Sequence, residues 1–99
     1  MVDKSVQLEN NKRQLLRLQL ALESYEDDTG EKLQSLNETN LELKNFRGTK
    51  QNLSSEEQIN ITDKIIEKYN QIIDIIGKDK FVFYDDGDIN YIWRGENNE

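Results

Sequence analysis

Leucines recur every seven residues through the first half of the chain, and further apolar side chains stand three residues after several of them. A seven-residue apolar repeat predicts a helix with one narrow apolar seam, which another helix has to cover. We call these positions the heptad seam: Leu8, Leu15, Leu18, Leu22, Tyr25, Leu36 and Leu43. The pattern favours a protein that works through protein–protein contact, and it predicts self-association through the seam.

The seam crosses four residues, Asp-Asp-Thr-Gly at 27–30, that are poor helix formers. The heptad phase nevertheless survives from Leu22 to Leu36, so the sequence is compatible with a break or with one locally strained helix. Asp28 and Glu31 spell a capping box for a new helix, and we prefer the break. An unbroken helix over 3–46 would instead extend about 65 Å at 1.5 Å per residue.

Asn11 also occupies a seam position. It is either buried, where a single amide fixes helix register and number, or exposed in a frayed first turn.

The third helical segment carries the clearest boundary signals. Ser54 and Glu57 form a capping box at its start, and Gly77 stands where a helix commonly stops. Gly48 is a similar stop signal for the second segment. Because isoleucines make the apolar face of the third segment broad, we expect it to pack against two neighbours.

After Gly77 the apolar period changes. Aromatic and β-branched runs at 80–84 and 89–93 flank Asp-Asp-Gly-Asp, which predicts a β-hairpin. We expect Tyr84 opposite Ile89, with Val82 opposite Tyr91 and Phe81 opposite Ile92. A lone hairpin is marginal in water, so this one has to dock on the helices or on a partner.

The sequence therefore predicts a mainly α protein. Its architecture is a helical hairpin or three-helix coiled-coil-like bundle followed by a C-terminal β-hairpin. The helical region covers 1–77, with helices at about 3–27, 30–46 and 54–76, the hairpin covers 78–95, and 96–99 form a tail.

Composition limits the chemistry. The chain has no Cys and no His, which removes thiolate chemistry, the commonest general base and the commonest metal ligand. Asp85, Asp86 and Asp88 could offer oxygen ligands, but the glycine and glutamate of a calcium loop are missing from the pattern. We expect no enzyme activity, cofactor or metal, no membrane span, and a cytoplasmic location.

Charge points to the class of partner. The formal net charge is −7, and residues 79–99 hold six acids against two bases, which gives −4. This balance disfavours direct nucleic-acid binding and favours a protein with a basic surface. The acidic, aromatic C-terminal third supplies the candidate contact residues: Tyr84, Asp85, Asp86, Asp88, Tyr91 and Trp93.

We therefore expect a small acidic regulator or inhibitor that docks on a larger protein, with nucleic-acid mimicry as one form. Residues with AT-rich codons abound, which suggests a low-GC bacterium, or a phage or mobile element within one. The alternative is a structural or assembly component that acts through its coiled coil.

Two short stretches resemble known families. Phe46-Arg47-Gly48, followed later by Tyr84 and Asp88, resembles the W-x-G turn and Y-x-x-x-D/E signal of helical-hairpin partners of type VII secretion. Here Phe replaces the turn Trp, and the Tyr falls in a strand-like run. Residues 63–69 resemble the second helix of small sporulation-phosphatase proteins, whose Ser-Gln-Glu-Leu run is absent. Neither resemblance transfers a function.

Overall fold

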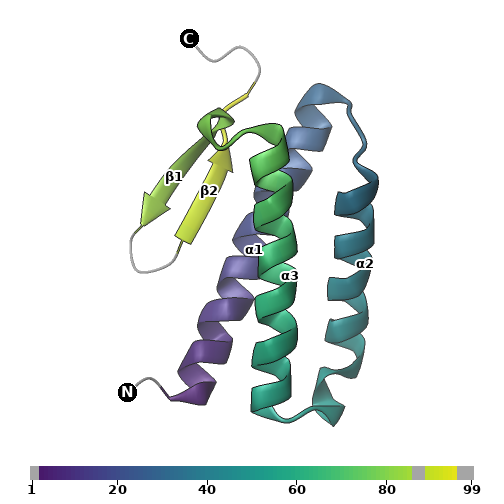
Figure 1. Ribbon diagram of the computed structural model, residues 1–99, viewed down its shortest axis with the longest axis vertical. Helices are drawn as coiled ribbons and strands as arrows, with labels where there is room; N and C mark the ends of the chain where they lie inside the picture. The colour runs from purple at the N-terminus through teal and green to yellow at the C-terminus, as the bar shows by residue number, and fades with distance from the viewer. Residues whose placement is uncertain (1–2, 86–88, 96–99) are drawn as a thin grey trace.

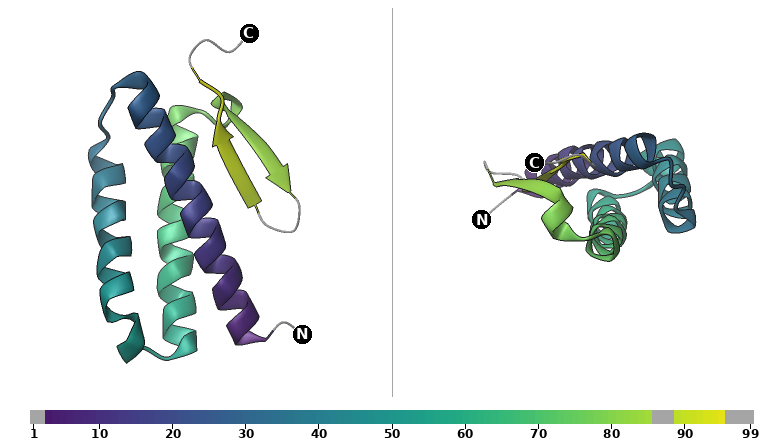
Figure 2. Two further views of the ribbon diagram at one scale, coloured as in Figure 1. Left: turned by 180° about the vertical axis from the view of Figure 1, so that it is seen from behind. Right: turned by 90° about the horizontal axis from the view of Figure 1, so that it is seen from above.

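The computed structural model describes residues 3–85 and 89–95, in which three helices precede a two-stranded antiparallel sheet (Figure 1). The mainly α fold with a C-terminal hairpin is therefore confirmed. The helices are α1 (Lys4–Thr29), α2 (Gln34–Thr49) and α3 (Ser55–Ile76), and the strands are β1 (Phe81–Asp85) and β2 (Ile89–Trp93). Short 3₁₀ turns, Lys50–Asn52 and Lys78–Lys80, lead into α3 and β1. Figure 2 shows α2 on the side of the bundle away from the hairpin.

The chain reverses after α1, which confirms the predicted break. Gly30 takes the left-handed conformation with φ of 77°, and its N–H donates to the Glu26 carbonyl at 2.8 Å. The Glu26 carboxylate accepts the Leu33 N–H at 2.8 Å across the turn. The predicted capping box of Asp28 and Glu31 is wrong, because α2 begins only at Gln34 and has no side-chain cap.

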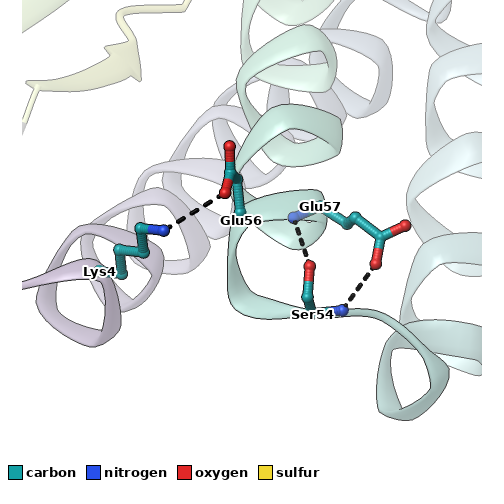
Figure 3. A network of polar contacts seen from close by, with 4 residues as sticks. All are labelled: Lys4, Ser54, Glu56 and Glu57. Atoms are coloured by element: carbon teal, nitrogen blue, oxygen red, sulfur yellow. Dashed lines mark hydrogen bonds and ion pairs between the residues drawn. The ribbon is translucent and has the colours of Figure 1, made fainter.

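The predicted boundaries of α3 are confirmed. Ser54 Oγ accepts the Glu57 N–H at 3.1 Å, and the Glu57 carboxylate accepts the Ser54 N–H at 2.9 Å (Figure 3). At the other end, the Gly77 N–H donates to the Ile73 carbonyl at 2.8 Å. Gly48 does not stop α2, which continues to Thr49, because a glycine costs a helix only about 1 kcal/mol.

Every residue of the heptad seam is buried within the single chain. Apart from Leu8, the seam residues join one core with the isoleucine face of α3, which contacts both α1 and α2 as the broad face predicts. The seam is thus covered by the chain's own helices. Self-association stays a prediction, and copies that joined through the seam would have to open this core.

Asn11 is buried and bonded, so the exposed alternative is wrong. Its Nδ2 donates to Thr62 Oγ1 at 2.9 Å and to Asp63 Oδ1 at 2.8 Å, both on α3. An unpaired buried amide is costly, so these bonds favour the one register of α1 on α3 that provides both acceptors.

The predicted hairpin register is wrong by one residue. Phe81 pairs with Trp93, Phe83 with Tyr91, and Asp85 with Ile89. A shift of one residue changes which side chains share a face. The observed register places four aromatic side chains on the same face of the sheet, whereas the predicted one would divide them between two faces. The four are Phe81, Phe83, Tyr91 and Trp93.

A matched pair of leucines on α1 tests the closed seam. Leu18 is completely buried and Leu20 is half exposed. We expect Leu18→Ala to lower the free energy of unfolding by about 2–5 kcal/mol and Leu20→Ala by less than about 1 kcal/mol. Urea titration followed by circular dichroism measures both. Equal effects would contradict the assignment of the seam to the chain's own core.

The α3 cap makes stability depend on pH. The hydrogen bond from the Ser54 backbone, and then that from its side chain, lowers the pKa of Glu57 below its ordinary 4.5. A carboxyl group whose pKa is lowered on folding stabilises the fold at pH values above its ordinary pKa. This contribution is lost as the pH falls through the lowered pKa.

We therefore expect Glu57→Gln to reduce the unfolding temperature near neutral pH. Its difference from the unsubstituted chain should shrink as the pH falls below the ordinary carboxyl pKa. Thermal unfolding from pH 7 to pH 2 measures this, with Glu67→Gln on the same helix as the control for lost charge. A difference that is the same at every pH would contradict the cap assignment.

Candidate functional site

Trp93 fastens the hairpin to the helices. Its indole N–H donates to Asp28 Oδ2 at 2.9 Å, and its ring meets Tyr25 edge to face with ring centres 4.9 Å apart. Tyr25 is itself buried in the bundle, so one ring joins the core to the sheet. This contact explains how a two-stranded hairpin keeps its place.

The aromatic face of the sheet changes from buried to exposed along β1. Phe81 is buried and stacks edge to face with Trp93 at 5.3 Å between centres. Tyr91 lies half-buried beside α1, and Phe83 contacts it at 5.3 Å while remaining 52% exposed. β2 is the strand beside α1, and Phe83 lies on the outer strand β1, two residues beyond the buried Phe81.

A shallow groove of about 280 Å³ runs between α1 and β2. Leu20 and Ala21 line one wall, and Tyr91 and Ile92 line the other. Leu20 and Ile92 are both about half exposed. Phe83 pairs with Tyr91, so it lies on the opposite face of the sheet from Ile92. We call the exposed apolar residues on and beside the hairpin the hairpin surface: Leu20, Phe83 and Ile92.

A second, more polar cleft of about 540 Å³ lies where α1 ends and the hairpin begins. Two of its polar side chains have structural partners. The Tyr25 hydroxyl donates to the Glu31 carboxylate, and Arg94 Nη1 donates to the Asp79 carbonyl at 3.1 Å. These two contacts support the fold at this junction.

The predicted contact residues have different positions. Tyr91 and Trp93 lie in β2, half-buried against α1, where Trp93 acts first as an anchor. The backbones of Tyr84 and Asp85 lie in β1, and their side chains lie outside the description. Asp86 and Asp88 fall outside the described residues. The assignment of all six as contact residues stays a prediction.

Sequence reasoning missed two features of this surface. Phe83 is not among the predicted contact residues, although its ring is 52% exposed, because exposure depends on how the hairpin packs on the helices. Asp28 was interpreted as a helix cap, although its carboxylate bonds Trp93, 65 positions away. No local sequence signal identifies either role.

Within residues 3–85 and 89–95, no group of three or more acidic, Cys or His side chains could hold a metal ion. The buried Tyr69 hydroxyl donates to Asn40 Oδ1 at 2.6 Å, and burial raises its pKa well above the ordinary value. It therefore stays a neutral structural donor. Among the described helices, none contains a segment long and apolar enough to cross a membrane.

Comparison with known proteins adds no assignment, since no family model, curated protein or solved structure matches this chain.

Two adjacent aspartates at the end of α1 test the anchor. We expect Asp28→Ala to lower the free energy of unfolding by about 1 kcal/mol, because the indole N–H loses a charged acceptor. The emission of Trp93, the only tryptophan, should change with it. Asp27→Ala removes the same charge at the neighbouring exposed position and is the control. Identical effects in the two variants would contradict the anchor.

Proposed function

We propose that this chain is a small non-catalytic protein-binding module, a regulator or inhibitor that docks on a larger protein through its hairpin. The observation that carries the proposal is the hairpin surface. Phe83 is 52% exposed and Ile92 47% exposed on a sheet of only two strands. Only 34% of the chain is hydrophobic. Apolar side chains that stay exposed on the two-stranded hairpin are therefore suited to contact with a partner.

The arrangement of the seam supports docking over the assembly alternative. A structural component that acts through its coiled coil needs a free apolar seam for another chain. Here the seam lies at the centre of the chain's own core, from Leu15 on α1 to Leu43 on α2, each about 1% exposed. The apolar positions left for a partner are therefore on the outside of the bundle and on the hairpin.

Charge supports a partner with a basic surface. The hairpin segment and tail carry −4, which speeds encounter with positive potential and disfavours contact with phosphate backbones. An inhibitor that occupies a nucleic-acid-binding surface is one form of this function. We propose the cytoplasm as the place of action, in a low-GC bacterium or in a phage or mobile element that it hosts.

The test is capture of a partner by three single variants. Phe83→Ser and Ile92→Ser remove apolar area from the hairpin surface. Ile75→Ser removes it from the outside of α3, where Ile75 is even more exposed, and is the matched control. We expect a discrete partner to bind the unsubstituted chain and Ile75→Ser equally, and the two hairpin variants at least tenfold more weakly.

Affinity purification identifies the partner, and calorimetry on the purified pair measures the affinities. Rising salt should weaken the complex, because exposed charges are screened over about 10 Å at 0.1 M. A complex that is unaffected by both hairpin variants would refute the hairpin surface as the docking site.

A further inference from the structure

The outer edge of β1 pairs with no other strand of the described residues. In Figures 1 and 2, β2 lies beside α1 and β1 lies on the side away from the helices. The five residue pairs of the hairpin follow one another without a bulge, and β1 contains no proline. Proteins often block such edges with a bulge, a proline or a covering segment. Among the described residues, nothing covers this one.

The pairing register identifies the backbone groups on that edge. The Arg94 N–H donates to the Lys80 carbonyl at 3.2 Å, so this pair is of the hydrogen-bonded type. Such pairs alternate along an antiparallel ladder, which makes Val82 and Tyr84 the strand residues that bond β2. The peptide groups of Phe81, Phe83 and Asp85 therefore point outward.

The Phe81 N–H already donates to the Lys78 carbonyl. Five groups remain on the edge: the carbonyls of Phe81, Phe83 and Asp85 and the N–H groups of Phe83 and Asp85. They form a continuous donor and acceptor row around Phe83, whose aromatic side chain is 52% exposed.

Resting on the proposed function, we infer that the partner adds an extended segment to the β1 edge as a third, antiparallel strand. The residue opposite Phe83 exchanges two backbone bonds with it, and the residues two positions away bond the Phe81 carbonyl and the Asp85 N–H. Side chains on the Phe83 side of this strand are apolar, because they lie beside a half-exposed ring.

The charge of the chain selects the occupant. Residues 79–99 carry −4, and the whole chain carries −7, so two copies that met edge to edge would repel each other. A partner segment in which Lys or Arg alternates with apolar residues is complementary in both charge and side-chain pattern. The inferred ligand class is therefore a basic, alternating, extended peptide.

The probe is the synthetic peptide Lys-Val-Lys-Val-Lys-Val-Lys, titrated into the full ¹⁵N-labelled chain. We expect saturable shifts of the Phe83 and Asp85 amides, while amides in the middle of α2 stay unchanged. A peptide with Glu in place of Lys should bind at least tenfold more weakly.

Two N-methylated peptides distinguish backbone pairing from simple charge attraction. N-methylation of the central valine blocks the edge that faces β1, whereas N-methylation of the preceding lysine blocks only the opposite edge. We expect the first to lose binding at least tenfold and the second to bind like the parent. Equal binding of the two would overturn the proposal, as would an absence of any saturable shift.

Two variants of one residue supply the matching test on the protein. Phe83→Pro removes the outward N–H without removing a bond to β2, and Phe83→Val keeps this N–H in a strand-forming residue. We expect the proline variant alone to lose binding at least tenfold while Trp93 emission stays unchanged. If the proline variant undocks the hairpin, the comparison of the methylated peptides on the unsubstituted chain decides.

Sedimentation of the chain without peptide tests the second copy as the occupant. A dimer that Phe83→Pro dissociates would overturn the assignment to a basic partner. If the peptides fail while Phe83→Ser still weakens a captured partner, the edge inference fails and the protein-binding function stands. If the peptides pair with the edge while the hairpin variants leave the affinity for the captured partner unchanged, the edge inference stands and the proposed function fails.

Discussion

The reversal at Gly30 is the constraint on which the rest of the structure depends. The heptad phase is the same on both sides of it, so a continuous helix would present the same apolar seam to solvent. With φ of 77°, Gly30 adopts a conformation that costs a residue with a side chain roughly 1–2 kcal/mol. An added Cβ would meet no atom within 4 Å, so the requirement there is one of backbone conformation and not of space. By turning the chain, this residue lets α2 return along the bundle and makes the seam internal.

Once the chain has turned, α1 has to serve two neighbours. Leu15 and Leu18 face the bundle, while Ala21 lines the groove against β2. Tyr25 serves both, because it is buried in the core and meets Trp93 at 4.9 Å. Damage at this end of α1 therefore affects the hairpin and the bundle together. The bond between Asp28 and Trp93 lies one turn further on and acts on the hairpin alone.

Local signals in the sequence predicted local structure well. The cap of Ser54 and Glu57 and the stop at Gly77 were correct, because each is decided by atoms within four residues of the helix end. The break at 27–30 was also correct, whereas its capping box was not. There the chain uses Glu26 to hold the Leu33 N–H, a bond across seven residues that the capping pattern does not encode.

Features decided by distant residues were harder to predict. The heptad seam was identified correctly as apolar, yet periodicity cannot state whether its cover comes from the same chain or from another. The hairpin register was predicted from the turn, but the observed pairing joins four aromatics on one face, and packing on α1 favours that arrangement. The bond between Asp28 and Trp93 and the exposure of Phe83 both depend on how the hairpin packs on the helices. The sequence therefore located the candidate site in the C-terminal hairpin, but it did not predict which of the side chains there would be exposed.

The same features that leave the hairpin marginal also make it suited to recognition. A third strand beside β1 would satisfy its outer edge and cover part of Phe83, and a partner would then find little to bind. An uncharged hairpin of this sequence pattern would pair with its own copies, because unprotected edges attract one another. The excess of acidic residues in 79–99 opposes that pairing while it favours a segment of opposite charge. In the proposed mode of binding, Trp93 holds the strand in place and the open edge offers the backbone bonds. The negative charge selects the segment that makes them.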